Sequence, residues 1–181
     1  MLRAMSALSS SEVHLTSCMT KVYASIGSNI EPTVNIQMCI TALRARYGTV
    51  DLSPVYETLA VGFVGAAFYN LVVGFTTDEE AHAVAQFFRT LERESGRDLH
   101  HAKFAPRTLD VDLLLYGDQV LDEAHLKIPR GEILEYAFVL RPLAELCPMG
   151  RHPVLGETFQ DLWQTFQGEK QGLKPVLGLE L

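Results

Sequence analysis

The sequence FAPRTLDVDLLLYG, residues 104–117, is the segment from which the fold and the chemistry of this chain are best inferred. From Leu109 to Tyr116 the only charged residues are Asp110 and Asp112, and a Gly-Asp turn follows. A run so rich in Leu and Val predicts a buried strand. Because successive side chains of a strand point to opposite faces, the two aspartates share one face and lie roughly 6.6 Å apart along it.

Two carboxylates this close repel each other, and burying them without a partner is costly. A divalent cation removes both problems. Mg²⁺ suits the site because it usually takes one or two carboxylates and completes its shell with waters and phosphates. A solvated strand face, or a structural carboxylate paired with an arginine, would also explain the pattern. The neighbouring Pro106 and Arg107, together with features elsewhere in the chain, favour the metal site.

On either side of this strand, hydrophobic periodicity and turn residues divide the chain into further elements. Helical spacing predicts helices at 32–47, 78–95 (capped by Thr77 or Asp78), 131–135 and 138–146, and a short last one containing Trp163 and Phe166. Strands are expected at 21–26, 50–56, 68–77, 109–116 and 119–121, with the last resuming at 126–128. The order β-α-β-β-α-β indicates an α+β fold, a ferredoxin-like βαββαβ sandwich whose mostly antiparallel sheet has flanking helices.

Composition narrows the class of protein. A length of 181 residues favours one compact domain, here 21–167, with a flexible extension at 1–20 and a tail at 168–181. The net charge of −7 argues against nucleic-acid binding, and no apolar run is long enough for a membrane span. Three scattered cysteines indicate reduced thiols and a cytoplasmic location. We expect a monomer or a weak homodimer.

Residues 97–107 form a basic loop in an otherwise acidic chain, with Arg97, Lys103 and Arg107 and a pair of histidines. A cationic lid that closes over an anionic substrate would explain this local charge. Loops are commonly polar, so a plain solvent-exposed loop is the alternative. The chain contains no G-x-x-x-x-G-K-[ST] sequence, so a P-loop is not expected to hold phosphates.

Several motifs follow one another in a characteristic order. Gly27-Ser28-Asn29 ends the first strand, Asn70 lies in the third, Glu92 precedes Gly96-Arg97, and PRTLDVDLL begins at Pro106. This order resembles the 6-hydroxymethyl-7,8-dihydropterin pyrophosphokinase family of folate biosynthesis, whose signature P-R-T-x-D-x-D-[LIV]-[LIVM] is matched in full. The resemblance covers roughly residues 21–166. It implies transfer of pyrophosphate from ATP to the hydroxymethyl group of a reduced pterin, with release of AMP.

The resemblance also implies roles for individual residues. Asp110 and Asp112 would hold two Mg²⁺ ions, and Arg97 and Arg107 would complete the catalytic set by stabilising the transferring phosphates. The pterin would be bound by Thr58, Phe68, Asn70, Asp110 and Phe138, with the two phenylalanines stacking on its ring. ATP would be bound by Glu92, Arg97, Phe104, Arg107, Lys127 and Arg130. Core packing is the alternative for each phenylalanine, and a structural ion pair is the alternative for Arg107.

The chain departs from the family pattern at several positions. Arg130-Gly131 stands where many members have His-Tyr or His-Pro, and Tyr136 stands where an arginine is frequent. Phe104 replaces a frequent tryptophan, and Arg97-Asp98-Leu99 replaces Arg-x-Arg. These differences keep open two alternatives on the same fold: a non-catalytic pterin- or nucleotide-binding protein, and an enzyme of altered specificity. A two-metal hydrolase built around the two aspartates is a third hypothesis.

Overall fold

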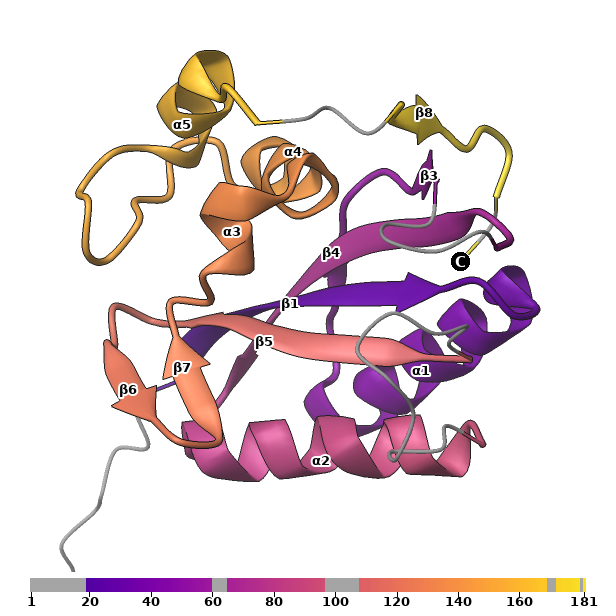
Figure 1. Cartoon of the computed structure of the whole chain (residues 1–181). Helices are drawn as coiled ribbons and strands as arrows, with labels where there is room; N and C mark the ends of the chain where they lie inside the picture. The colour runs from indigo at the N-terminus through magenta and orange to yellow at the C-terminus, as the bar shows by residue number, and fades with distance from the viewer. Residues whose placement is uncertain (1–18, 60–64, 97–107, 169–171, 180) are drawn as a thin grey trace, which may run out of the picture.

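A six-stranded antiparallel sheet organises the molecule (Figure 1). The computed structural model describes residues 19–59, 65–96, 108–168, 172–179 and 181. Along the sheet the strands follow the order β5-β1-β4-β3-β8, and β2 also pairs with β4. Their bounds are Thr20–Ser28 (β1), Asp51–Leu52 (β2), Tyr56–Thr58 (β3), Phe68–Thr77 (β4), Asp110–Tyr116 (β5) and Lys174–Pro175 (β8). The sheet and its helices confirm the predicted α+β, ferredoxin-like architecture.

Helices cover both faces of this sheet, which gives three layers (Figure 1). On one face α1 (Pro32–Tyr47) and α2 (Ala81–Glu94) pack against alternate residues of the central strands, such as Val22, Ala24 and Phe75. On the other face α3 (Glu132–Glu135), α4 (Ala137–Leu146) and α5 (Phe159–Thr165) form a second core with Val72 and Leu114. Because β4 is covered on both faces, Leu71–Phe75 is buried without a break and reads as a continuous apolar run.

Local sequence explains the limits of the first helix. Pro32 lies in its first turn, where a missing N–H costs nothing, and Asn35 donates a hydrogen bond through Nδ2 to the carbonyl of Ile30 at 2.7 Å. Gly48 follows the last residue with φ at 77°, a conformation that favours glycine. The predicted helix at 32–47 is confirmed.

The structure corrects the predicted limits of several elements. The predicted strand at 50–56 is two short strands, β2 and β3, because the chain breaks at Ser53-Pro54; Ser53 exchanges hydrogen bonds with Val72 there through its backbone and its hydroxyl. The helix expected from residue 78 begins at Ala81, and its N-cap residue Glu80 makes no side-chain cap bond. The hydroxyl of Thr77 instead accepts a hydrogen bond from the N–H of Glu79, in the turn before the helix.

A two-stranded hairpin, β6 (Leu121–Glu123) and β7 (Leu126–Ile128), follows β5. The predicted strand at 119–121 thus begins later, and 126–128 is confirmed. Two contacts fasten the hairpin to α2: His82 lies 2.8 Å from Glu123, and Arg89 donates to the carbonyl of His125 at 3.0 Å. The hairpin therefore lies beside the outer edge of β5.

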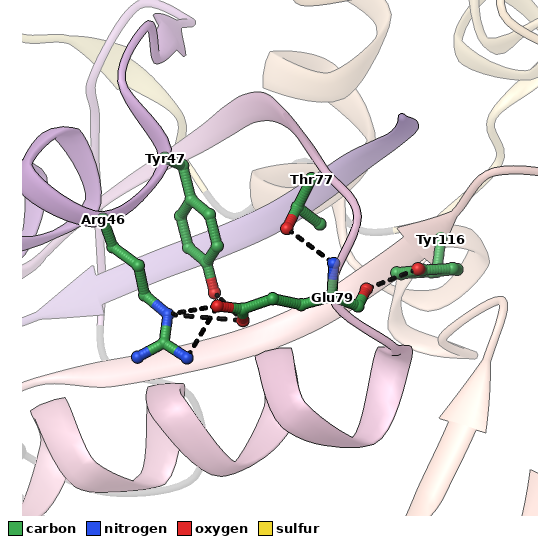
Figure 2. Close-up of polar contacts among 5 residues, drawn as sticks. All are labelled: Arg46, Tyr47, Thr77, Glu79 and Tyr116. Atoms are coloured by element: carbon green, nitrogen blue, oxygen red, sulfur yellow. Dashed lines mark hydrogen bonds and ion pairs between the residues drawn. The ribbon is translucent and has the colours of Figure 1, made fainter. Parts of the chain in front are cut away.

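Glu79, in the turn between β4 and α2, connects three parts of the fold (Figure 2). Its carboxylate accepts hydrogen bonds from Arg46 Nε at 2.9 Å and from the Tyr47 hydroxyl at 3.2 Å, both at the end of α1. Its backbone carbonyl accepts one from the hydroxyl of Tyr116, the last residue of β5. This cluster lies at the end of β5 opposite to the two aspartates.

The remaining described segments complete the molecule. After α5 the chain returns to the sheet, where β8 pairs with β3 and Val176 donates to the carbonyl of Val55. Cys39 and Cys147 carry free thiols, as the sequence predicts for them. Within the described residues no helix is both long and apolar enough to cross a bilayer.

Candidate active site

One sheet face brings the predicted metal and pterin residues together. In the antiparallel register, Asp110 pairs with Gly27 and Asp112 pairs with Ser25 on β1, and Gly27 in turn pairs with Asn70 on β4. These residues occupy alternate positions of their strands, so their side chains share the face that carries α3 and α4. Strand pairing therefore places both aspartates and Asn70 side by side although they are distant in sequence.

Gly27 allows this close approach. A Cβ atom at this position would lie only 3.0 Å from Asn70 Oδ1 and 4.0 Å from the Cβ of Asp110. Contacts of 3.0 Å to a Cβ are tighter than nearly all those in real structures, so a side chain here would displace Asn70. The glycine thus leaves the surface between the amide and the carboxylate open.

A cavity of about 430 Å³ opens over this face. Such a volume is typical of pockets for small molecules and cofactors. Most of the predicted site residues that the structure describes line it, namely Thr58, Phe68, Asn70, Glu92, Asp110, Asp112, Arg130 and Phe138. The cavity continues around the outer edge of β5 to α2 and the hairpin, where Arg89 and His125 also line it.

Thr58 and Asn70 form the polar part of the cavity, where the pterin is predicted to bind. The Nδ2 group of Asn70 donates a hydrogen bond to Thr58 Oγ1 at 2.8 Å, and both residues are buried. This bond fixes the amide orientation and directs Oδ1 toward Gly27. A buried amide held in one orientation presents a defined hydrogen-bonding edge to a ligand.

The two predicted stacking residues lie on the cavity wall and are half-buried. Phe138 is itself stacked on Tyr136, with ring centroids 5.0 Å apart and planes inclined by 17°. Tyr136 was expected only as a residue that stands in place of an arginine, and this ring pair was not predicted. The two residues lie two positions apart in the sequence. Helical spacing could not predict their contact, because Tyr136 precedes α4 and Phe138 lies within it.

At the end of the cavity where Asp112 lies, the side chain of Arg130 contacts two carboxylates. Arg130 Nη2 lies 2.7 Å from Asp112 Oδ1, and Arg130 Nε lies 3.3 Å from Glu132 Oε2. The side chains of Arg130 and Asp112 are each 33% exposed. Asp112 is thus paired with an arginine, as one of the alternatives predicted. The arginine is Arg130, and both residues line the cavity.

Two carboxylates on one strand fit what Mg²⁺ takes from a protein when phosphates and water provide its other ligands. Among the described residues, no group of three or more histidine, cysteine, aspartate or glutamate side chains is arranged to hold a metal. The two aspartates therefore suit a cation whose remaining ligands are phosphate oxygens and water.

Glu92 contributes to the site through the backbone of β5. It is buried on α2, and its Oε1 accepts a hydrogen bond from the N–H of Val111 at 3.0 Å, between the two aspartates. Since β5 is an edge strand, this bond satisfies an N–H group on its open side. Glu92 is thus a buried group bonded to the strand, and not a solvent-exposed charge on the helix.

Lys127 lies apart from the other predicted residues. It is exposed on β7 and pairs with Asp122 at 2.8 Å, and it is not among the residues that line the cavity. Strand alternation explains this, because its neighbour Leu126 faces the cavity and Lys127 therefore points to the opposite side. Arg97, Phe104 and Arg107 lie outside the residues that the structure describes.

Five polar residues that were not predicted also line the cavity: Ser25, Arg89, His125, Glu132 and Glu135. Two of them had a signal in the sequence. Ser25 shares its face of β1 with Gly27 of the Gly-Ser-Asn motif, and Arg89 lies three positions before the predicted residue Glu92 on α2. The hairpin and α3 residues had none, because tertiary packing alone brings them to β5.

Comparisons with known proteins identify the family to which this chain belongs. Residues 23–148 match the model of the family described as 7,8-dihydro-6-hydroxymethylpterin-pyrophosphokinase. The chain is 36% identical over 137 residues to a 2-amino-4-hydroxy-6-hydroxymethyldihydropteridine pyrophosphokinase of Pseudomonas aeruginosa, a match that covers 74% of this chain and 84% of the relative. A protein of the same description from Synechocystis is 34% identical over 160 residues, covering 86% and 80%.

Solved structures show the same fold. Plasmodium falciparum HPPK-DHPS, in a triple-mutant form, superimposes with a TM-score of 0.66 at 13% sequence identity, over 81% of this chain and 43% of that one. The chain thus spans less than half the length of that solved protein. From its match over residues 23–148 and its relatives at 36% and 34% identity, the chain belongs to the 7,8-dihydro-6-hydroxymethylpterin-pyrophosphokinase family of enzymes.

Proposed function

We propose that this protein transfers pyrophosphate from ATP to the hydroxymethyl group of 6-hydroxymethyl-7,8-dihydropterin and releases AMP. The observation that carries the proposal is the shared cavity, in which Asp110 and Asp112 face the same space as Asn70 and Phe138. A reduced pterin needs a hydrogen-bonding edge and a flat apolar wall, and a polyphosphate needs cations; this cavity has residues for both. The family membership of the chain supports the same reaction.

In this reaction the hydroxyl oxygen of the pterin attacks the β-phosphorus of ATP. The bond between that phosphorus and the oxygen bridging to the α-phosphorus breaks, the bridging oxygen leaves with AMP, and the hydroxyl proton is released. Transfers of this kind depend mainly on positioning and on neutralising phosphate charge. Two Mg²⁺ ions held by Asp110 and Asp112 would supply that neutralisation.

The chain's own residues divide the remaining tasks. Asn70, fixed by Thr58, orients the pterin edge, while Phe68 and Phe138 enclose its ring. Glu92 holds the backbone of β5 between the aspartates and so keeps their spacing. Arg97 and Arg107 stabilise the transferring phosphates, with Phe104 on the nucleotide side.

The proposed enzyme occupies most of the chain. Residues 21–167 form the catalytic unit, and residues 1–20 and 168–181 lie outside it. The protein acts in the cytoplasm as a monomer or weak homodimer, with ATP and a reduced pterin as its ligands and without nucleic acid or membrane partners.

A second candidate is a protein that binds pterin and nucleotide without transferring pyrophosphate. The observation that favours it is the ion pair between Arg130 and Asp112, which occupies one of the two metal-binding carboxylates. Under this alternative both ligands bind, yet no AMP forms in their presence.

The test is AMP formation from ATP with Mg²⁺, measured with and without the pterin alcohol. We expect AMP and no ADP, only when the pterin is present. Asp110→Asn and Asp112→Asn should each lower kcat by at least about a hundredfold, since charge neutralisation carries most of this chemistry. Unchanged kcat in both variants would exclude the metal role, and ATP hydrolysis without pterin would indicate a two-metal hydrolase instead.

A further inference from the structure

Arg130 lies between β7 and α3, lines the cavity and contacts one of the two carboxylates proposed to bind metal. Its guanidinium lies 2.7 Å from Asp112 Oδ1, on the sheet face where the metal is proposed to bind. A guanidinium in that position neutralises Asp112 while no metal is present. It also competes with a cation for the same carboxylate oxygen.

The contacts of Arg130 are incomplete. Its Nε atom is buried and, within the described part of the chain, has no hydrogen bond, although Glu132 Oε2 lies 3.3 Å away in poor geometry. A buried donor without an acceptor is unfavourable, and a partly exposed ion pair is weak. Arg130 is therefore held loosely enough to leave Asp112 when a better ligand becomes available.

The backbone around Arg130 is held more firmly than its side chain. The N–H of Arg130 donates to the carbonyl of Leu114 on β5 at 3.0 Å, and Ile128 before it is fully buried. The side chain is thus anchored next to the cavity and can turn within it without movement of the strand. Phosphate oxygens are suitable new acceptors because the guanidinium fork matches their geometry.

We propose that Arg130 is a positioning residue that couples metal binding to nucleotide binding. This inference rests on the proposed function of the site. Without nucleotide, Arg130 stays on Asp112 and weakens the binding of a free divalent cation. When the metal–nucleotide complex enters, the cation takes Asp112 and the released guanidinium binds the phosphates. The site consequently selects the complex over the free metal.

The test is Mn²⁺ binding, followed by the electron paramagnetic resonance signal of the free ion, with and without a non-hydrolysable ATP analogue. Arg130→Gln should bind Mn²⁺ alone about fivefold more tightly than the natural protein, and its Mn²⁺–analogue complex about fivefold more weakly. Arg130→Lys, which keeps the charge but loses the fork, should lie between the two proteins.

Arg89→Gln is the matched control. Arg89 lines the same cavity and carries the same charge, but it donates to the carbonyl of His125 and not to Asp112. Its Mn²⁺ affinity should stay within about twofold of the natural protein. Equal tightening in both glutamine variants would reduce the effect to net charge, and unchanged or weaker Mn²⁺ binding in Arg130→Gln would also overturn the inference. AMP formation by the natural protein separates either failure from failure of the proposed function.

Discussion

At Gly27 a single hydrogen atom stands where any other residue would bring a Cβ against Asn70. The amide of Asn70, the carboxylate of Asp110 and the hydroxyl of Thr58 come from three strands, and their spacing depends on strand pairing and on this one small residue. The identity of the side chains alone does not form the site. The backbones of β4 and β5 must also lie close to β1, between them.

Gly27→Ala tests this dependence. The added Cβ, 3.0 Å from Asn70 Oδ1, should displace the amide and lower kcat/KM for the pterin about tenfold or more, because small misplacements of positioning groups are costly. Steady-state kinetics with the pterin varied measures the effect. Gly131→Ala is the control, since its Cβ would meet nothing closer than Glu135 Oε1 at 3.7 Å; equal losses in both variants would contradict the steric explanation.

Individual residues were predictable where a motif or strand alternation specified their direction. The alternation in LDVDL placed Asp110 and Asp112 on one face, which the structure confirms. The same rule, applied to residues 126–128, would have excluded Lys127 from the cavity. The contact between Arg130 and Asp112 was not predictable, because it depends on how the segment after β7 returns to the edge of β5.

Elements were predictable where local chemistry determined their limits. Pro32 and Gly48 bound α1, and the unbroken apolar run of β4 fits a strand covered on both faces. The break between β2 and β3 was missed because Ser53 replaces regular pairing with a side-chain hydrogen bond. β8 has no hydrophobic pattern, since Lys174 and Pro175 are exposed, and only the pairing with β3 defines it.

Glu79 joins α1, α2 and β5 (Figure 2), and we predict that its contacts stabilise the packing of these elements. Burial, and then the carboxylate of Glu79, hold the pKa of Tyr47 above its ordinary value, so its hydroxyl remains a donor. Glu79→Ala removes the acceptor of both Tyr47 and Arg46 and should lower the free energy of unfolding by about 1–2 kcal/mol. Urea denaturation measures the change.

Asp51→Ala is the matched control for Glu79→Ala. It breaks the more exposed pair between Lys21 and Asp51 and should cost less than about 0.5 kcal/mol. Because Glu79 lies at the opposite end of β5 from the aspartates, AMP formation by folded Glu79→Ala protein should be normal. A loss of activity with unchanged stability would contradict a purely structural role.

At the scale of the whole molecule, His152 is a buried titratable group that responds to mild acid. His152 is 4% exposed, and its Nδ1 accepts hydrogen bonds from the N–H groups of Val154 and Leu155 at 3.3 Å. Burial lowers the pKa of His152 below its ordinary value of 6.5. As pH falls below 6.5 the unfolded chain takes up this proton first, so the contribution of His152 to stability decreases.

The protein should therefore lose stability between pH 7.5 and pH 5, and His152→Gln should lose less over the same interval. The quantity to compare is the slope of the unfolding free energy against pH for the two proteins. His82→Gln, at an exposed histidine paired with Glu123, controls for the loss of a histidine. If the His152→Gln slope equals that of the natural protein, the buried imidazole is not the group responsible.

The central claim is that Asp110 and Asp112 together hold the cations that accompany ATP. The most direct measurement is a crystal structure with Mn²⁺ and a non-hydrolysable ATP analogue, using anomalous scattering to locate the metal. We predict peaks within coordination distance of both carboxylates, about 2.0–2.2 Å for a cation of this kind, with phosphate oxygens completing the shell. Metal bound to the analogue elsewhere in the cavity, with Asp112 still on Arg130, would contradict the account.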